Sequence, residues 1–195
     1  MTGGYLFSNQ CQVWLPMRFS NHDPVNSKTL NVGRLGSAGD AAFGAGAAEP
    51  TKLDYRRGYE FDGGDYFTIS SFASGTYSVG MLLDIGVTDG KYLFDATGGA
   101  GTGGCHLVGA VITPTTGTVY QDGESGHTTL QVGLRTIVIT GMTLDPSTNL
   151  IVGADNAGAN GMVGSLHQFF IADFALTPTQ VWQAHIEALR RFNKV

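Results

Sequence analysis

Three acidic residues, two on a predicted strand and one just after it, are the first candidates for chemistry. Glu60 and Asp62 alternate within an aromatic run, so both side chains would point to the same side of a strand. Glycoside hydrolysis uses such a carboxyl pair, and retaining enzymes place the second acid about 5 Å from the first. The third acid, Asp65, follows Gly63-Gly64, where a turn is expected. We therefore predict solvent-facing acids that flank a hairpin, and we assign no catalytic residue.

A second polar group lies in a glycine-rich loop near the end of the chain. Asp155, Asn156 and Asn160 fall within residues 154–161, between two apolar runs. Carboxylate and amide oxygens are calcium ligands, but the same residues also form ordinary turns. We interpret this segment as a candidate ligand loop and assign no metal to it.

Other catalytic and cofactor motifs are not supported by their surroundings. Gly99-x-Gly101-x-x-Gly104 matches the dinucleotide fingerprint, which requires a helix directly after the last glycine. The run that follows is β-branched and ends at Pro114, so we predict a loop and a strand without a cofactor. The five histidines lack metal-ligand spacing, and no Gly-x-Ser-x-Gly nucleophile motif occurs. With no catalyst visible, the sequence predicts that the chain is not an enzyme.

The elements that would position these residues are mostly short strands. Turn residues separate them at regular intervals and no strand–helix–strand alternation occurs, which predicts an all-β sandwich of two antiparallel sheets. The expected strands and hairpins are 12–19, 57–69, 76–85, 91–96, 107–113, 118–126, 135–141, 149–153 and 162–176.

One helix is predicted at the C-terminal end, over residues 178–192. Thr177 suits the N-cap, Pro178 the first helical position and Gln180 the third, which together make a capping box. Apolar residues then recur every three or four positions and predict one buried face. These residues are Val181, Trp182, His185, Ile186, Leu189 and Phe192.

Several of these segments resemble a known family. Leu150-x-x-Gly153, Gly164-Ser-Leu-x-x-Phe-x-Ile171 and Ala175-Leu-Thr-Pro178 are similar to the closing segment of laminin-G-like jelly rolls, in the concanavalin A-like lectin/glucanase superfamily. The run around Phe61 to Ile69 and Tyr120-x-Asp-Gly123 resemble hairpins of the same family. The resemblance implies a jelly roll. It also implies two activities to consider, namely calcium-dependent carbohydrate binding and glucan hydrolysis.

Phe170 and Phe174 depart from the family pattern, because the resemblance implies polar, solvent-facing residues at these positions. Either a neighbouring loop of the chain or another subunit would have to cover them. Because exposed aromatic patches generally mark interfaces, we predict a candidate assembly surface at these two residues.

Length and composition limit the remaining choices. The 195 residues predict a single domain, 1–195, large enough to bury its own core. The net charge of −5 disfavours nucleic acid as a partner. No signal peptide and no apolar stretch of about 18 residues is present, which predicts no membrane insertion. Residues 21–52 are rich in glycine and alanine and predict a long loop or an arm that a partner orders.

Three functional hypotheses follow from these observations. The leading one is a bacteriophage virion protein, such as a capsid decoration, head-fibre or tail adhesion protein, that forms a homo-oligomer and binds other capsid or tail proteins in the virion. Its support is the 14% content of charged residues, the missing signal peptide, Phe170 with Phe174, and segment 21–52. The alternative is a carbohydrate-binding lectin module that attaches to a surface glycan. The third hypothesis is a glucan hydrolase that uses Glu60 and Asp62.

Overall fold

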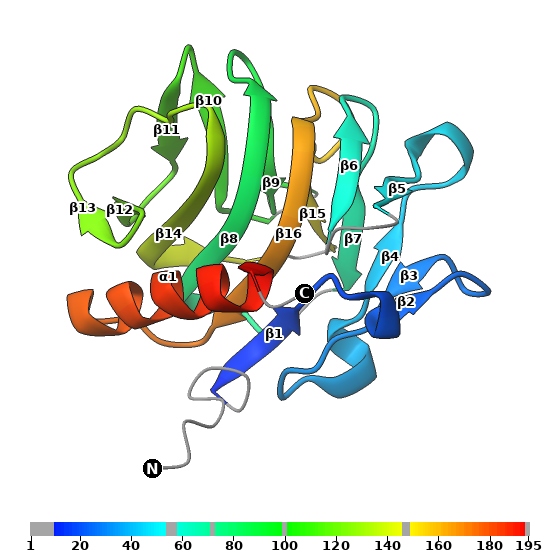
Figure 1. The fold of residues 1–195 in the computed structure, drawn as a ribbon, viewed down its shortest axis with the longest axis horizontal. Helices are drawn as coiled ribbons and strands as arrows, with labels where there is room; N and C mark the ends of the chain where they lie inside the picture. Colours follow the sequence, from blue (N-terminus) through cyan, green and yellow to red (C-terminus); the bar gives the residue numbers. More distant parts are fainter. Residues whose placement is uncertain (1–9, 54–57, 71–72, 99–100, 146–148, 194–195) are drawn as a thin grey trace.

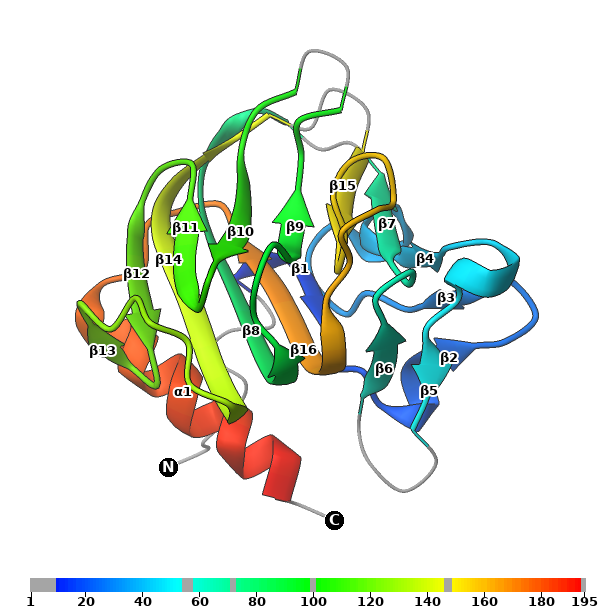
Figure 2. The ribbon, with the colours of Figure 1, turned by 90° about the horizontal axis from the view of Figure 1, so that it is seen from above.

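The computed structural model describes residues 10–53, 58–70, 73–98, 101–145 and 149–193. This part of the chain forms two antiparallel sheets that pack face to face, and one α-helix lies outside one of them (Figures 1 and 2). The sheets do not close into a barrel. The predicted all-β sandwich with a C-terminal helix is therefore confirmed.

The first sheet, sheet A, carries the helix on its outer side. Along the sheet the strands follow the order β13-β12-β14-β8-β16-β6-β5, and β1 pairs with β16 beyond the end of β6. Its strands are β1 (Cys11–Leu15), β5 (Thr51–Lys52), β6 (Tyr59–Asp62), β8 (Gly75–Val87), β12 (Thr118–Gln121), β13 (Glu124–Ser125), β14 (Gly133–Leu144) and β16 (Val163–Ala172).

The second sheet, sheet B, has the order β11-β10-β9-β15-β7-β4-β3-β2. Its strands are β2 (His22–Asp23), β3 (Lys28–Thr29), β4 (Ala41–Phe43), β7 (Phe67–Ser70), β9 (Tyr92–Asp95), β10 (Gly104–Val108), β11 (Val111–Pro114) and β15 (Asn149–Val152).

The main core lies between the two sheets, where every second residue of the long strands points inward. Strand β8 shows this alternation most clearly and confirms the face predicted from the sequence. Each large side chain buried in this way stabilises the fold by about 1.5–3 kcal/mol. The inward residues of β8 are Tyr77, Val79, Met81, Leu83 and Ile85.

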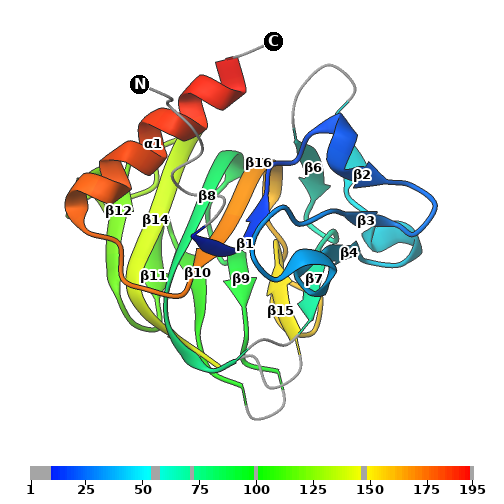
Figure 3. The ribbon, with the colours of Figure 1, turned by 90° about the horizontal axis from the view of Figure 1, so that it is seen from below.

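A second, smaller core lies between the outer face of sheet A and helix α1 (Pro178–Asn193), which crosses that face (Figure 3). The predicted capping box begins the helix: Thr177 N–H donates to Gln180 Oε1 at 2.9 Å, and Gln180 N–H donates to Thr177 Oγ1 at 3.4 Å. Among the described residues, no helix is both long enough and apolar enough to span a membrane.

The buried face of α1 differs from the predicted one at Trp182, which is 48% exposed. The helix instead buries Val181, Ala184 and Ala188, whose small side chains let its axis approach the sheet closely. The indole of Trp182 packs over Gly123, since a Cβ placed there would lie 2.5 Å from Cε3 of the tryptophan. The prediction that Trp182 belongs to the buried face is therefore wrong.

The histidine on α1, His185, packs as the sequence predicts, with its polar edge satisfied. Its Nδ1 atom lies 3.0 Å from the Thr136 hydroxyl of β14. Burial lowers the pKa of this imidazole, which favours the neutral ring inside the packed layer.

Phe170 does not lie on an assembly surface, so that prediction is wrong. Its side chain is only 2% exposed and stacks on Trp14 of β1, with ring centroids 5.5 Å apart. Gly80 on the neighbouring strand makes room for the ring, because a Cβ there would lie 2.2 Å from Cζ of Phe170. Phe174 is partly buried against the same cluster. The chain's own strand β1 and helix α1 therefore cover these positions.

Two predicted strand connections also differ in the structure. Strand β6 pairs with β16 in sheet A, whereas β7 pairs with β15 in sheet B. The glycines at 63–64 therefore carry the chain between the sheets and do not close a hairpin. The run 107–113 contains a hairpin between β10 and β11, turning at Gly109 with φ +60°. The hairpin at Asp122-Gly123 is confirmed, and both residues have positive φ as a type I′ turn requires.

Segment 21–52 contributes short strands to the edges of both sheets. Strand β4 pairs with β7 and extends sheet B through β3 and β2, while β5 pairs with β6 in sheet A. The buried Asn31 side chain anchors this segment, because its Oδ1 accepts the N–H groups of Trp14 at 2.7 Å and Gly33 at 2.8 Å. Three short 3-10 helices lie in or next to the segment: η1 (Phe19–Asn21), η2 (Gly36–Gly39) and η3 (Gly46–Ala48).

Candidate functional site

The loop between β15 and β16 is organised around Asp155. Its Oδ1 accepts the backbone N–H groups of Ala157 at 3.0 Å and Ala159 at 2.8 Å. Its Oδ2 accepts the side-chain amide of Asn160 at 2.8 Å, and Asn160 adopts a positive φ of 51°. A short polar side chain tolerates this conformation better than most others. The Asp155 carboxylate therefore fixes the loop's own shape.

A second carboxylate, Asp95, ties this loop to the end of β9. Asp95 is 4% exposed and accepts the N–H groups of Thr97 at 2.9 Å and Asn156 at 3.0 Å. The Asn156 side-chain amide also donates to the Thr97 hydroxyl at 3.1 Å. These contacts hold Asn156 in place while its side chain stays exposed.

An aromatic pair lies beside the loop on sheet B. The Tyr92 and His106 rings stack with centroids 5.3 Å apart and planes 26° apart, and both side chains are half-buried. Tyr92 also donates its N–H to the carbonyl oxygen of Asn160 at 3.0 Å. The pair therefore adjoins the C-terminal end of the loop.

A third aromatic ring, Tyr66, packs against the loop at Gly158. Gly158 has a φ of +72°, and a Cβ there would lie 2.9 Å from Cε1 of Tyr66, so the ring lies directly against the loop backbone. Figure 2 shows the segment between β15 and β16 beside β9 and β7. The loop therefore contacts two tyrosines, Tyr66 and Tyr92.

The geometry of this loop suits neutral hydrogen-bonding ligands better than a metal ion. Calcium needs six to eight oxygen ligands, but the Asp155 carboxylate already accepts three hydrogen bonds. Asn160 turns its NH₂ group toward Asp155 and not its oxygen. Within the described ranges, no three His, Cys, Asp or Glu side chains form a group that could hold a metal ion. The loop does bring Asp155, Asn156 and Asn160 together, and Asn156 and Asn160 remain exposed.

Two of the three acids in and after β6, Asp62 and Asp65, bind the chain's own backbone. Glu60 and Asp62 lie exposed on the same side of the strand, as the sequence predicts. Asp65 is only 4% exposed and accepts the N–H of Asp62 at 2.8 Å, while Asp62 accepts the N–H of Gly64 at 2.9 Å. Burial raises the pKa of the Asp65 carboxyl. Asp62 and Asp65 therefore hold the passage of the chain between the sheets.

The sequence pointed to the loop but missed Tyr92 and His106. These residues are fourteen positions apart, and they meet only because β9 and β10 pair with an irregularity in register next to His106. Alternation within each strand predicts which face a side chain takes, but it does not predict the partner across the strands.

The glycine fingerprint does not form a dinucleotide site. It needs a helix after Gly104, and Gly104 instead begins β10. The first glycine of the motif, Gly99, lies outside the described residues.

No family model matches the chain, and no curated protein does. Among solved structures, it is similar to a Trypanosoma rangeli sialidase in complex with the inhibitor DANA, at 13% identity and a TM-score of 0.58, over 94% of this chain and 34% of that chain. A structure on the ganglioside-dependent cell entry of botulinum neurotoxin type C matches at 9% identity and 0.52, over 92% and 51%. The binding domain of botulinum neurotoxin DC, in complex with rat synaptotagmin II, matches at 8% and 0.51, over 92% and 52%.

These similarities show the fold, a two-sheet antiparallel β-sandwich. The chain spans about a third of the sialidase and about half of the two toxin chains. The prediction that the chain is not an enzyme is corrected by this finding, because sialidases are among the structures that share its fold. The lack of a recognisable catalytic motif in the sequence therefore does not justify placing the chain among non-enzymatic proteins.

Proposed function

We propose that the chain is a carbohydrate-binding module whose ligand site combines loop 154–161 with the Tyr92–His106 pair. One observation carries this proposal: two exposed amide side chains, Asn156 and Asn160, lie on a hydrogen-bonded loop that contacts a stacked aromatic pair.

The chemistry of this arrangement fits a sugar. A sugar ring presents hydroxyl groups around its edge and C–H groups on its faces. Amide side chains both donate and accept hydrogen bonds, so they can pair with hydroxyls of either orientation. An aromatic ring offers an apolar face together with a polar edge. The loop is already held by Asp155 and Asp95, so little conformational entropy is lost on binding.

Two of the similar structures support a binding function in general, but not a particular ligand. One similar structure concerns a toxin whose cell entry depends on two ganglioside molecules, and another is a binding domain in complex with a protein receptor. Extension of glycan binding to this chain is our proposal. The laminin-G-like and concanavalin A-like resemblance of the sequence agrees with it.

A glycan array with the full chain tests the proposal. We expect the wild type to bind at least one glycan, and we expect Asn156→Ala and Tyr92→Ala each to weaken that binding about tenfold, the loss of roughly 1.4 kcal/mol. Asn149→Ala is the matched control, because Asn149 is exposed on β15 outside the loop. If no glycan binds, or if Asn156→Ala and Asn149→Ala behave alike, the proposal fails.

Calcium provides a second test of the same site. The loop is held by hydrogen bonds to Asp155, so we expect glycan binding to persist in EDTA. Binding that disappears on chelation and returns with calcium would contradict this account of the loop.

The virion hypothesis remains a second proposal, although the structure removes part of the evidence for it. The covered position of Phe170 removes one reason for it. Val25 and Val32 on segment 21–52 are 88% and 46% exposed, but valines exposed singly are normal on a protein surface and do not indicate a partner. The support that remains is the 14% content of charged residues. Sedimentation should then show oligomers or association with virions, and a strict monomer that binds no virion would end this hypothesis.

A further inference from the structure

The loop between β15 and β16 uses most of its backbone donors within the chain itself. From Asp155 to Met162, every backbone N–H except that of Asn160 donates to an acceptor within the described residues. The carboxylates of Asp155 and Asp95 accept three of these N–H groups, and backbone carbonyls accept the others. A ligand that approaches the loop therefore meets few free N–H groups.

The two exposed side-chain amides also turn their NH₂ groups toward the protein. Asn160 Nδ2 donates to Asp155 Oδ2 at 2.8 Å, and Asn156 Nδ2 donates to the Thr97 hydroxyl at 3.1 Å. Because a carboxylate accepts hydrogen bonds and never donates them, the NH₂ group of Asn160 has to face Asp155. The carbonyl oxygen of each amide lies on the opposite side from its NH₂ group. The two asparagines therefore offer a ligand mainly acceptors.

Three backbone carbonyls add to this set of acceptors. The carbonyl oxygens of Asn156, Ala157 and Gly158 accept no hydrogen bond from the described part of the chain. Together with the two amide oxygens, five carbonyl oxygens are available to a ligand. Three N–H hydrogens remain beside them, namely the backbone hydrogen of Asn160 and the second hydrogen of each NH₂ group. Acceptors therefore outnumber donors in this site.

The charged groups around the loop carry a net negative charge. Asp155 lies in the loop and Asp95 binds its backbone, whereas residues 149–161 contain no lysine or arginine. Lys91, which precedes Tyr92, contributes one positive charge against these two carboxylates. Asp95 is only 4% exposed, so salt screens its charge less than it screens a fully exposed carboxylate. An acid group on a ligand would be repelled here, and a hydroxyl group would not.

We propose that this site selects glycans whose bound sugar donates hydrogen bonds and carries no acid group. This inference rests on the proposed carbohydrate-binding function and deepens it. The hydroxyl group of a neutral sugar can rotate to donate to the carbonyl oxygens of the loop. A carboxylate or sulfate group only accepts hydrogen bonds, so it would leave those oxygens unpaired and would be repelled by Asp155. Sugars with such a group at the bound position are therefore rejected.

A glycan array of matched pairs tests this inference with the full chain. Each neutral glycan is printed beside the same glycan with one hydroxymethyl group oxidised to a carboxylate, and beside the same glycan with one added sulfate group. We expect the neutral member to bind at least about tenfold more tightly than either acidic member. An acidic member that binds as tightly as its neutral partner, with the loss in Asn156→Ala preserved, would overturn the inference and leave carbohydrate binding in place. If no glycan binds, carbohydrate binding itself fails and the inference fails with it.

Salt distinguishes repulsion by charge from exclusion by shape. Charge repulsion is screened as the ionic strength rises, so the difference in affinity between the neutral and acidic members should narrow when sodium chloride is added. A difference that does not change with salt would mean that the acid group is excluded by its size, and it would overturn the inference.

A reversal of charge at Asn156 locates the selection in the loop. Asn156→Lys replaces an acceptor by an ammonium group that only donates, while the backbone N–H of this residue still donates to Asp95. We expect the ratio of neutral to acidic affinity to fall at least about tenfold. Asn149→Lys is the matched control, because it adds the same charge on β15 outside the loop, and it should leave the ratio unchanged. An unchanged ratio in Asn156→Lys, or equal changes in the two variants, would overturn the inference.

Discussion

Replacing Gly80 by alanine should create a clash under helix α1. The added methyl would lie 2.2 Å from Cζ and 2.3 Å from Cε1 of Phe170, far inside contact distance. The ring cannot easily move away, because it stacks on Trp14 and is 2% exposed. Overpacking of this kind typically costs about 1–3 kcal/mol, so Gly80→Ala should lower the free energy of unfolding by that amount.

The companion change, Phe170→Ala, should cost about 3–5 kcal/mol, because it empties a buried aromatic site. In the double variant Gly80→Ala/Phe170→Ala, the new methyl occupies space that the ring has vacated. The clash term should then disappear, and the double variant should be more stable than the sum of the single effects by about 1–3 kcal/mol.

Urea unfolding followed by far-ultraviolet circular dichroism measures all four proteins. If the effects of Gly80→Ala and Phe170→Ala add within about 0.5 kcal/mol in the double variant, the two positions do not share space. The conclusion that the Phe170 ring packs over Gly80 would then be wrong. A loss of less than about 1 kcal/mol in the free energy of unfolding for Phe170→Ala alone would mean that the ring is not buried within one chain. The assembly surface predicted from the sequence would then again be the better interpretation.

Three further predictions test other parts of the fold. Thr177→Ala removes the hydroxyl that caps α1 and should lower the free energy of unfolding by about 0.5–2 kcal/mol in urea titrations, whereas Thr177→Ser should cost much less. Burial raises the pKa of the Cys11 and Cys105 thiols to about 12, so iodoacetamide at neutral pH should modify neither until urea unfolds the chain; mass spectra showing rapid modification of the native protein would contradict their burial. Burial also raises the pKa of Asp65, so the folded state holds this proton more tightly than the unfolded state. The stability from Asp65 is therefore fully present below the unfolded pKa of about 3.9 and is lost as the pH rises through the folded value. Asp65→Asn should gain stability relative to the wild type over that rise, and a constant difference would contradict the burial.

The sequence was most informative where structure depends on near neighbours. The capping box at Thr177 and Gln180 involves residues three positions apart, and the turn at Asp122-Gly123 depends on residues that tolerate positive φ. The alternation along β8 likewise follows from the period of a single strand. Each of these features was correctly predicted because its cause is local.

The features that the sequence did not yield depend on partners far along the chain. The sequence run 57–69 resembles a hairpin, yet β6 pairs with β16 in sheet A and β7 pairs with β15 in sheet B. No local sequence signal reveals that the two strands belong to different sheets. Phe170 is covered only because Trp14 and α1 reach it and Gly80 leaves space.

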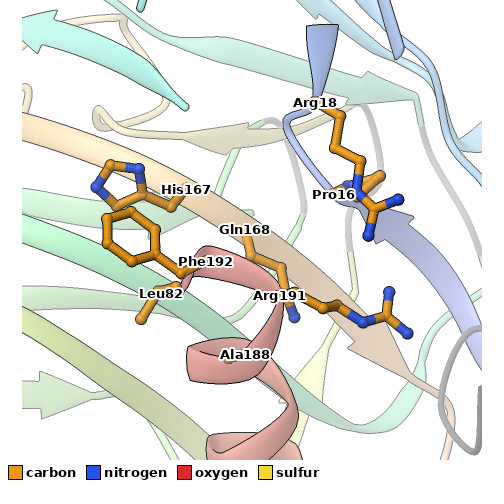
Figure 4. A pocket seen from close by; sticks show the side chains of 8 residues that line it. All are labelled: Pro16, Arg18, Leu82, His167, Gln168, Ala188, Arg191 and Phe192. Atoms are coloured by element: carbon orange, nitrogen blue, oxygen red, sulfur yellow. The ribbon is translucent and has the colours of Figure 1, made fainter. Parts of the chain in front are cut away.

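The candidate site and strand β16 pose the same difficulty. Tyr92 meets His106 across two strands whose register shifts beside the histidine. The register shift in β16 places both His167 and Gln168 on the side of sheet A that faces α1 (Figure 4). Alternation alone would have placed His167 and Gln168 on opposite faces. The loop residues were found from the sequence because all of them lie within one short segment.

The most direct measurement of the proposed sugar site is an NMR titration of the ¹⁵N-labelled chain with a glycan identified on the array. We predict that the largest shifts fall on the side-chain amides of Asn156 and Asn160 and on the backbone of Tyr92 and His106. Shifts confined to another face of the sandwich, with the Asn156 and Asn160 amides unmoved at saturation, would contradict the proposed site.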